Sequence, residues 1–80
     1  MKTNDIKKGT RVKLRNGWFA TIEDNKKGNV RMATVEGVYT EMGSVYANDI
    51  VLVQYEGAWV SPEYTPEQEK NLQMRKAMGL

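Results

Sequence analysis

Hydrophobic and polar residues alternate over short distances along most of the chain, and breaks that contain glycine or asparagine separate these runs. Val, Ile, Thr, Tyr and Trp are common in the runs, as is typical of β-strands. The pattern predicts strands at residues 10–15, 18–24, 30–36, 38–41, 44–46, 50–55 and 58–60. Strands this short favour a small closed or half-closed barrel, because closure removes exposed sheet edges.

The first two predicted strands are joined at Asn16-Gly17, and the loop length decides which side chains face the core. A two-residue loop would mix cations with apolar residues on one face. A three-residue loop, with Gly17 in the left-handed position of a bulge, pairs Leu14 with Trp18 and keeps the faces separate. Val12, Leu14, Trp18, Ala20 and Ile22 then face inward, and Arg11, Lys13, Phe19, Thr21 and Glu23 face outward. We favour this register because burial of one face specifies register strongly.

The last residues predict a helix at 66–78. Thr65 is a suitable N-cap, Pro66 suits the first helical position, and Gln68 completes a capping box. The apolar residues of this segment do not form a clean helical stripe, so we expect a helix that is loosely docked, frayed or held by a partner. The predicted organisation is a β-barrel over residues 1–62 and a capped helical tail over residues 63–80, in the same domain or loosely docked.

Charge is distributed unevenly along these 80 residues. Residues 1–34 contain nine cations and three acids, whereas residues 35–69 contain seven acids and no cation. Such asymmetry can mark a surface that faces a polyanion. It can equally reflect two halves of one barrel that attract each other.

The composition excludes most catalytic chemistry. The chain has no histidine and no cysteine, which removes the usual general base, the thiolate and the usual zinc ligands. Lys26 stands where a calcium loop at Asp24 would need an oxygen ligand. No apolar run is long enough to span a membrane, and the first residues lack the hydrophobic segment of a secretory signal. The predictions are therefore a cytoplasmic protein that is no enzyme and has no cofactor and no metal site.

The cations of the first half suggest a binding surface. The predicted nucleic-acid-binding residues are Arg11, Lys13, Arg15, Lys26, Lys27 and Arg31, which would contact phosphates, and Phe19, on which a base would stack. The alternative is that these cations only solvate the outer face, while Phe19 packs under the C-terminal helix.

The stretch "DIKKGTRVKLRNGWFATIEDN", followed by "GSVYANDIVLV", resembles the SH3-like small barrels, and the KOW-type members in particular. These open with a glycine, an alternating strand, a glycine-containing turn and a second strand, and they form a tight helical turn before the last strand, where this chain has "YANDI". The resemblance covers residues 5–55 and implies a mainly β fold, an SH3-like barrel of five to six short antiparallel strands, to which the short C-terminal α-helix is added. KOW-type barrels commonly bind RNA or the transcription and translation machinery, whereas other members bind peptides or chromatin tails.

These observations predict a non-catalytic module that contacts nucleic acid or a nucleoprotein through its basic hairpin face. The alternative is a protein-interaction module that docks on a host protein by its acidic half or its helix, in the style of the small phage or prophage inhibitors and adaptors that the compact format resembles. Self-association into a homo-oligomer, acidic face to basic face, is a third possibility.

Overall fold

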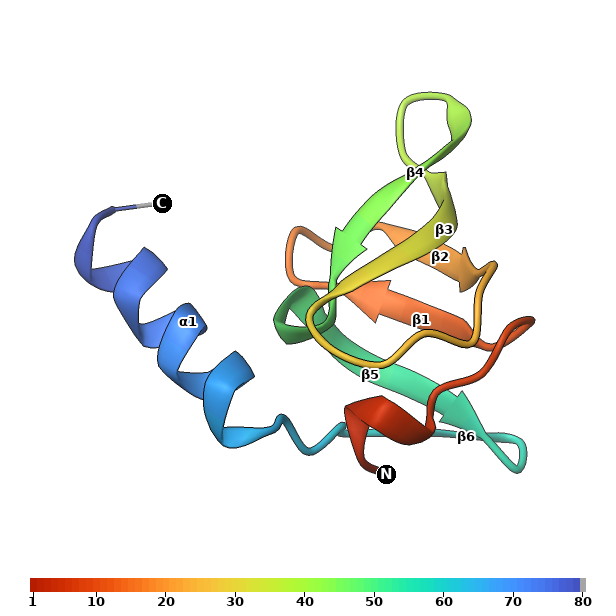
Figure 1. Ribbon diagram of the computed structural model, residues 1–80. Helices are drawn as coiled ribbons and strands as arrows, with labels where there is room; N and C mark the ends of the chain where they lie inside the picture. Colours follow the sequence, from red (N-terminus) through yellow and green to blue (C-terminus); the bar gives the residue numbers. More distant parts are fainter. Residues whose placement is uncertain (80) are drawn as a thin grey trace.

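A computed structural model describes residues 1–79 and contains one six-stranded antiparallel sheet and a C-terminal helix (Figure 1). The elements are η1 (Thr3–Asp5), β1 (Arg11–Leu14), β2 (Phe19–Ile22), β3 (Val30–Glu36), β4 (Thr40–Tyr46), η2 (Ala47–Asp49), β5 (Ile50–Tyr55), β6 (Ala58–Val60) and α1 (Pro66–Ala77). The strand order is β4-β3-β2-β1-β5-β6. The predicted mainly β fold with a C-terminal helix is confirmed.

The prediction of two short strands at 38–41 and 44–46 is wrong, because a single strand, β4, runs through both segments. Met42-Gly43 was expected to break the strand. Gly43 instead pairs with Ala33 in an uninterrupted β3–β4 register, and its φ is not positive. The turn lies earlier, at residues 37–39, where the Gly37 N–H donates to the Tyr39 carbonyl over 3.1 Å.

The first hairpin has the predicted register. Val12 pairs with Ala20, the Leu14 N–H donates to the Trp18 carbonyl over 2.7 Å, and Gly17 has a φ of 92°. Trp18 differs from the prediction, because 43% of it remains exposed. Its ring lies flat against Gly37, where an added Cβ would approach the ring to 2.5 Å. The indole therefore covers the start of the β3–β4 turn rather than filling the core.

The interior is lined by residues from five strands. The main buried cluster consists of Ile6, Val12, Leu14, Ala20, Ile22, Ala33, Val45, Ile50 and Val53. Because β1 to β5 all contribute to this one cluster, the sheet must curve around a shared interior, and in Figure 1 β3 and β4 cross over β1 and β5.

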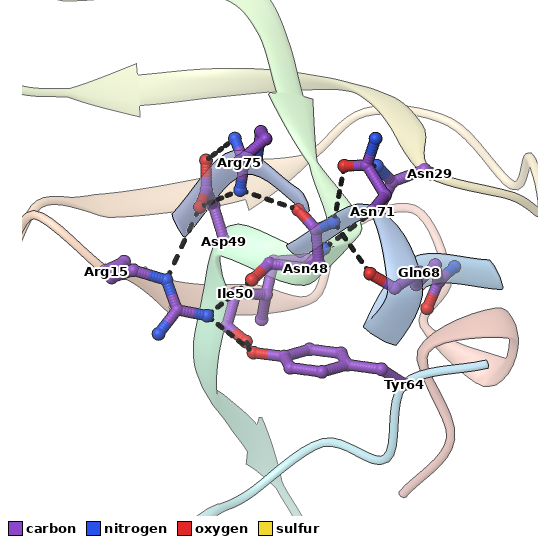
Figure 2. Close-up of polar contacts among 9 residues, drawn as sticks. All are labelled: Arg15, Asn29, Asn48, Asp49, Ile50, Tyr64, Gln68, Asn71 and Arg75. Atoms are coloured by element: carbon purple, nitrogen blue, oxygen red, sulfur yellow. Dashed lines mark hydrogen bonds and ion pairs between the residues drawn. The ribbon is translucent and has the colours of Figure 1, made fainter. Parts of the chain in front are cut away.

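The helix α1 has the predicted capping box. The Gln68 N–H donates to Thr65 Oγ1 over 3.2 Å, and the Thr65 N–H donates to Gln68 Oε1 over 3.0 Å. The helix docks on η2 through polar side chains that gather around the buried Asn48 (Figure 2), and its Leu72 is buried. Met74 and Met78 stay exposed. The helix is thus held at one corner of the sheet by polar contacts, which explains why its apolar residues form no clean stripe.

Candidate functional site

Two aromatic rings lie side by side on the outer face of the sheet. Phe19 of β2 and Trp59 of β6 have ring centroids 5.8 Å apart, with an angle of 51° between the ring planes. They are 36% and 41% exposed. The Cζ atom of Arg11 and the Nζ atom of Lys13 lie 5.7 Å and 5.9 Å from the Phe19 centroid. The predicted ring between two cations is therefore at the surface, and Phe19 does not pack under α1.

Trp59 is not among the predicted site residues. It pairs with Gln54 in the β5–β6 hairpin, while its neighbour Val60 packs against the core. The alternation of Ala58, Trp59 and Val60 assigns Trp59 to the outer face once Val60 is recognised as the inward residue. That alternation was the available signal, but a strand of three residues makes it weak.

Arg11 is partly neutralised by a neighbour on β3. Its guanidinium donates to the two carboxylate oxygens of Glu36 over 2.8 Å and 3.1 Å. These hydrogen bonds lower the pKa of Glu36 and raise the pKa of Arg11. Arg11 can still orient the Phe19 ring, but its positive charge is already paired with Glu36, so it would attract a phosphate less strongly.

Arg15 belongs to the cluster around η2 rather than to the Phe19 face. Its Nε lies 3.5 Å from Asp49 Oδ1, and its Nη2 donates to the Asn48 carbonyl and, over 3.3 Å, to the Tyr64 hydroxyl (Figure 2). The Tyr64 hydroxyl in turn donates to the Ile50 carbonyl over 2.6 Å. Burial is the main reason why the pKa of Tyr64 is raised. Arg15 thus ties the chain before α1 to the sheet.

The structure removes Arg31 from the predicted surface, since this side chain is fully buried. Its Nε donates to the Gly28 carbonyl over 3.0 Å, and its Nη2 donates to the Thr3 carbonyl and to Asn4 Oδ1 over 3.1 Å and 3.2 Å. Burial lowers its pKa. The prediction of a phosphate contact fails because Arg31 pairs with Val45 on the inward face of β3, in phase with the buried Ala33. The strand alternation could have revealed this.

Lys26 and Lys27 are exposed in the connection between β2 and β3, and neither takes part in an ion pair within residues 1–79. A hydrogen bond of 2.8 Å from the Lys8 N–H to Asn25 Oδ1 holds this connection beside the turn before β1. The exposed Lys7 and Lys8 therefore lie next to them. We call Lys7, Lys8, Lys26 and Lys27 the lysine loops. Figure 1 shows that the β2–β3 connection, which contains Lys26 and Lys27, then runs back toward α1, where the Gly28 carbonyl accepts from Gln68 Nε2 over 3.1 Å.

Lys7 and Lys8 were not predicted, although the sequence contains a signal for them. The triplet Lys-Lys-Gly occurs twice, at 7–9 and at 26–28. Both glycines have a positive φ, 91° for Gly9 and 94° for Gly28, so each triplet ends in a turn that favours glycine. A repeated dilysine before a turn glycine places charge at loop tips, where side chains reach solvent.

The two explanations of the charge asymmetry each hold for a different residue type. Arg11 pairs with Glu36 and Arg15 with Asp49, so arginines of the first half do bind acids of the second half. None of the lysines takes part in an ion pair within the described residues 1–79. The arginines stabilise the fold, and the lysines form the basic surface.

Asp24 organises the second lysine loop. Its Oδ2 accepts from the Met32 N–H over 2.7 Å, and its Oδ1 accepts from the Lys26 N–H over 3.1 Å. The bond from Met32 is the main reason why the pKa of Asp24 is lowered.

Replacing Asp24 by Asn is expected to lower the free energy of unfolding by about 1 kcal/mol at neutral pH, because a neutral amide oxygen accepts these hydrogen bonds less strongly. Because the pKa of Asp24 is lower in the folded chain, its contribution to stability is fully present above the ordinary pKa of 3.8. This contribution is lost as the pH falls through the pKa of the folded state. Urea unfolding of both proteins should therefore differ at neutral pH and converge in strong acid. A difference that persists in acid would contradict this assignment.

Within residues 1–79 no group of three or more Asp, Glu, His or Cys side chains is arranged to hold a metal ion. None of the described helical segments combines the length and the apolar character needed to cross a bilayer.

The site thus consists of Phe19 and Trp59, the adjacent Arg11 and Lys13, and the lysine loops. A comparison of the chain with protein-family models, with curated proteins and with solved structures finds no match.

Proposed function

We propose that the chain is a non-catalytic module that binds single-stranded nucleic acid across the outer face of β1, β2 and β6. The observation that carries this proposal is the exposed Phe19–Trp59 pair beside cations. Unpaired bases stack on such rings, whereas the bases of a duplex are already stacked on each other. The single-stranded form is therefore the preferred ligand.

The lysine loops supply the second part of the interface. Unpaired ammonium groups can replace the counterions of phosphates without first breaking an internal ion pair. Lys8 lies in the turn before β1 and Lys13 lies in β1 beside Phe19, so the five residue steps between them span at most about 17 Å. One short oligonucleotide can thus contact the rings and the loops together.

The resemblance to KOW-type barrels, many of which bind RNA, supports the same proposal, and a nucleoprotein that presents a single strand would suit the face equally well. The absence of cysteine supports a reducing compartment such as the cytoplasm.

Titration of short single-stranded and duplex oligonucleotides by filter binding, at several salt concentrations, tests the proposal. The affinity for single strands should fall with a logarithmic slope of about −0.7 per neutralised phosphate. Replacing Lys26 and Lys27 together by Glu should weaken binding at least roughly tenfold and make the salt slope shallower. Phe19→Ala and Trp59→Ala should each cost about 1–3 kcal/mol of binding free energy with little change in the slope.

The matched control replaces Lys70 and Lys76 of α1 by Glu, which makes the same change of charge at exposed positions outside the proposed interface. This control should bind single strands nearly as well as the original chain. The proposal fails if no single strand binds at low salt, or if the control loses as much affinity as the Lys26 and Lys27 variant.

A further inference from the structure

A second candidate surface lies on the α1 side of the molecule. The strand β4, the β1–β2 loop and α1 line a groove of about 670 Å³. Leu14, Trp18, Val35, Val45 and Leu72 are its apolar lining. Residues 41–46 of β4 form one wall, and Leu72, Arg75 and Lys76 of α1 form the other. The groove is thus a channel between a strand and a helix.

The wall formed by β4 is a free sheet edge. β4 is the last strand in the sheet order, and no strand within residues 1–79 pairs with its outer side. The Ala47 N–H donates to the Asn29 carbonyl over 2.7 Å, which shows that the odd-numbered residues of β4 form the hydrogen-bonded pairs with β3. In an antiparallel ladder the alternate residues direct their backbone groups outward. The N–H and C=O groups of Met42, Ser44 and Tyr46 therefore point away from β3.

This edge has little of the usual protection against pairing with another chain, since its one charged residue is Glu41, close to the β3–β4 turn. β4 is seven residues long, its register is uninterrupted, and its sequence "TEMGSVY" contains neither lysine nor proline. Long edges without bulges, prolines or lysines are templates for a further strand. The groove gives such a strand a place to lie, with α1 on its far side.

The inner face of β4 has room for a side chain. Gly43 lies on that face, between Glu41 and the buried Val45, and a Cβ added to Gly43 would meet no atom within 4 Å. A strand added at the edge would direct the side chain opposite Gly43 toward the same face. A large apolar residue fits there, because the lining of the groove is apolar.

The charges of the groove differ between its two ends. At the η2 end, Arg15 and Arg75 share the carboxylate of Asp49, and Lys76 has no ion pair among the described residues. The cations therefore outnumber the acids at that end. Glu41 lines the groove nearer the β3–β4 turn. An acidic side chain of a ligand is thus favoured beside Arg75 and Lys76.

We propose that this groove binds an extended segment of a partner protein, which adds to β4 as a seventh strand. The segment places one large apolar side chain over Gly43 and an acidic side chain near Arg75 and Lys76. Strand addition to an exposed edge takes affinity from backbone hydrogen bonds and specificity from alternate side chains. This surface is independent of the proposed nucleic-acid interface.

A displayed library of random peptides, selected on the whole 80-residue chain, identifies a probe. Enriched peptides should combine a large apolar residue with an acidic residue, and calorimetry should give their affinities. The Gly43→Leu variant should fold, because the added Cβ has space and the φ of residue 43 is not positive. Its side chain occupies the space above residue 43, so the variant should bind the peptides at least roughly tenfold more weakly. Gly43→Ala is the matched control and should retain most of the affinity.

Two further variants test the backbone and the charge. Ser44→Pro removes a free-edge N–H without removing a β3–β4 hydrogen bond, and it should abolish binding. Lys76→Glu should weaken acidic peptides, whereas Lys70→Glu, on the same helix but outside the groove, should not. In amide exchange, bound peptide should protect the N–H groups of Met42, Ser44 or Tyr46.

The proposal is overturned if the library yields no binder, if binders tolerate Gly43→Leu, or if binders tolerate Ser44→Pro. It is also overturned if sedimentation shows that the chain dimerises and that Ser44→Pro restores the monomer, because the occupant is then a second copy. Gly43→Leu should leave oligonucleotide binding unchanged, so failure here is distinguishable from failure of the proposed function.

Discussion

Replacing Arg31 by Ala is expected to lower the free energy of unfolding by about 3 kcal/mol. The side chain is fully buried, so its removal leaves a cavity. The same change deletes three hydrogen bonds that join β3 to Thr3, Asn4 and Gly28. A domain of this size has a total stability of only about 5–15 kcal/mol, so urea unfolding should show a clear shift of the midpoint.

Two variants separate packing from hydrogen bonding at this position. Arg31→Met keeps most of the side-chain volume, and each acceptor keeps a second donor, from Ile6, Gly28 or Gln68. The free energy of unfolding should therefore fall by less in Arg31→Met than in Arg31→Ala, by about 1 kcal/mol. Arg11→Ala, which deletes the surface ion pair with Glu36, is the control and should also cost about 1 kcal/mol or less. If Arg31→Ala costs no more than Arg11→Ala, the buried guanidinium contributes no net stability.

Replacing Asn48 by Ala is expected to release α1 from the sheet. The Asn48 Nδ2 donates to the Gln68 carbonyl over 3.0 Å and to Asn71 Oδ1 over 2.9 Å, and its Oδ1 accepts from Arg75 over 3.0 Å. Since these groups lose a partner at a buried position, about 2–3 kcal/mol of stability should be lost. A free helix of 12 residues is marginal in water, so released α1 should unfold while the sheet remains.

Amide hydrogen exchange measures this effect directly. In the Asn48→Ala variant, the α1 amides should exchange much faster, whereas the amides of β1 and β5 should keep most of their protection. Gln73→Ala is the control, because within residues 1–79 the exposed Gln73 side chain hydrogen-bonds to Glu69 of the same helix and to no residue of the sheet. Equal protection of α1 in Asn48→Ala and Gln73→Ala would show that the other contacts of α1, such as the Arg75–Asp49 ion pair and the bond from Gln68 to the Gly28 carbonyl, suffice to hold the helix.

The accuracy of the sequence-based predictions depends on whether the deciding interactions are local. The register of the first hairpin was predicted correctly. It follows from the alternation of apolar and polar residues over positions 10 to 23 and from the positive φ that the turn requires at Gly17. The capping box of α1 is also local. Gly43 was mistaken for a break because glycine in a strand and glycine in a turn look alike without the partner strand.

The interactions that were missed join segments far apart in sequence. Strand alternation could indicate that Arg31 faces inward, but the acceptors that satisfy its guanidinium come from Thr3 and Asn4 of η1, and no local pattern shows them. The docking of α1 rests on Asn48, Gln68 and Asn71, which are polar, so a search for an apolar stripe could not find it. The free edge of β4 follows from the strand order, which is a property of the whole sheet.

The two tryptophans divide between the two proposed surfaces. Trp18 lines the groove between β4 and α1, and Trp59 lies against Phe19 on the outer face. Each surface therefore contains one tryptophan fluorophore. If either Trp18 or Trp59 is replaced by Phe, the tryptophan fluorescence of the variant reports on the surface that keeps its indole. Such a pair of chains can reveal whether an oligonucleotide and a peptide occupy the protein simultaneously or exclude each other.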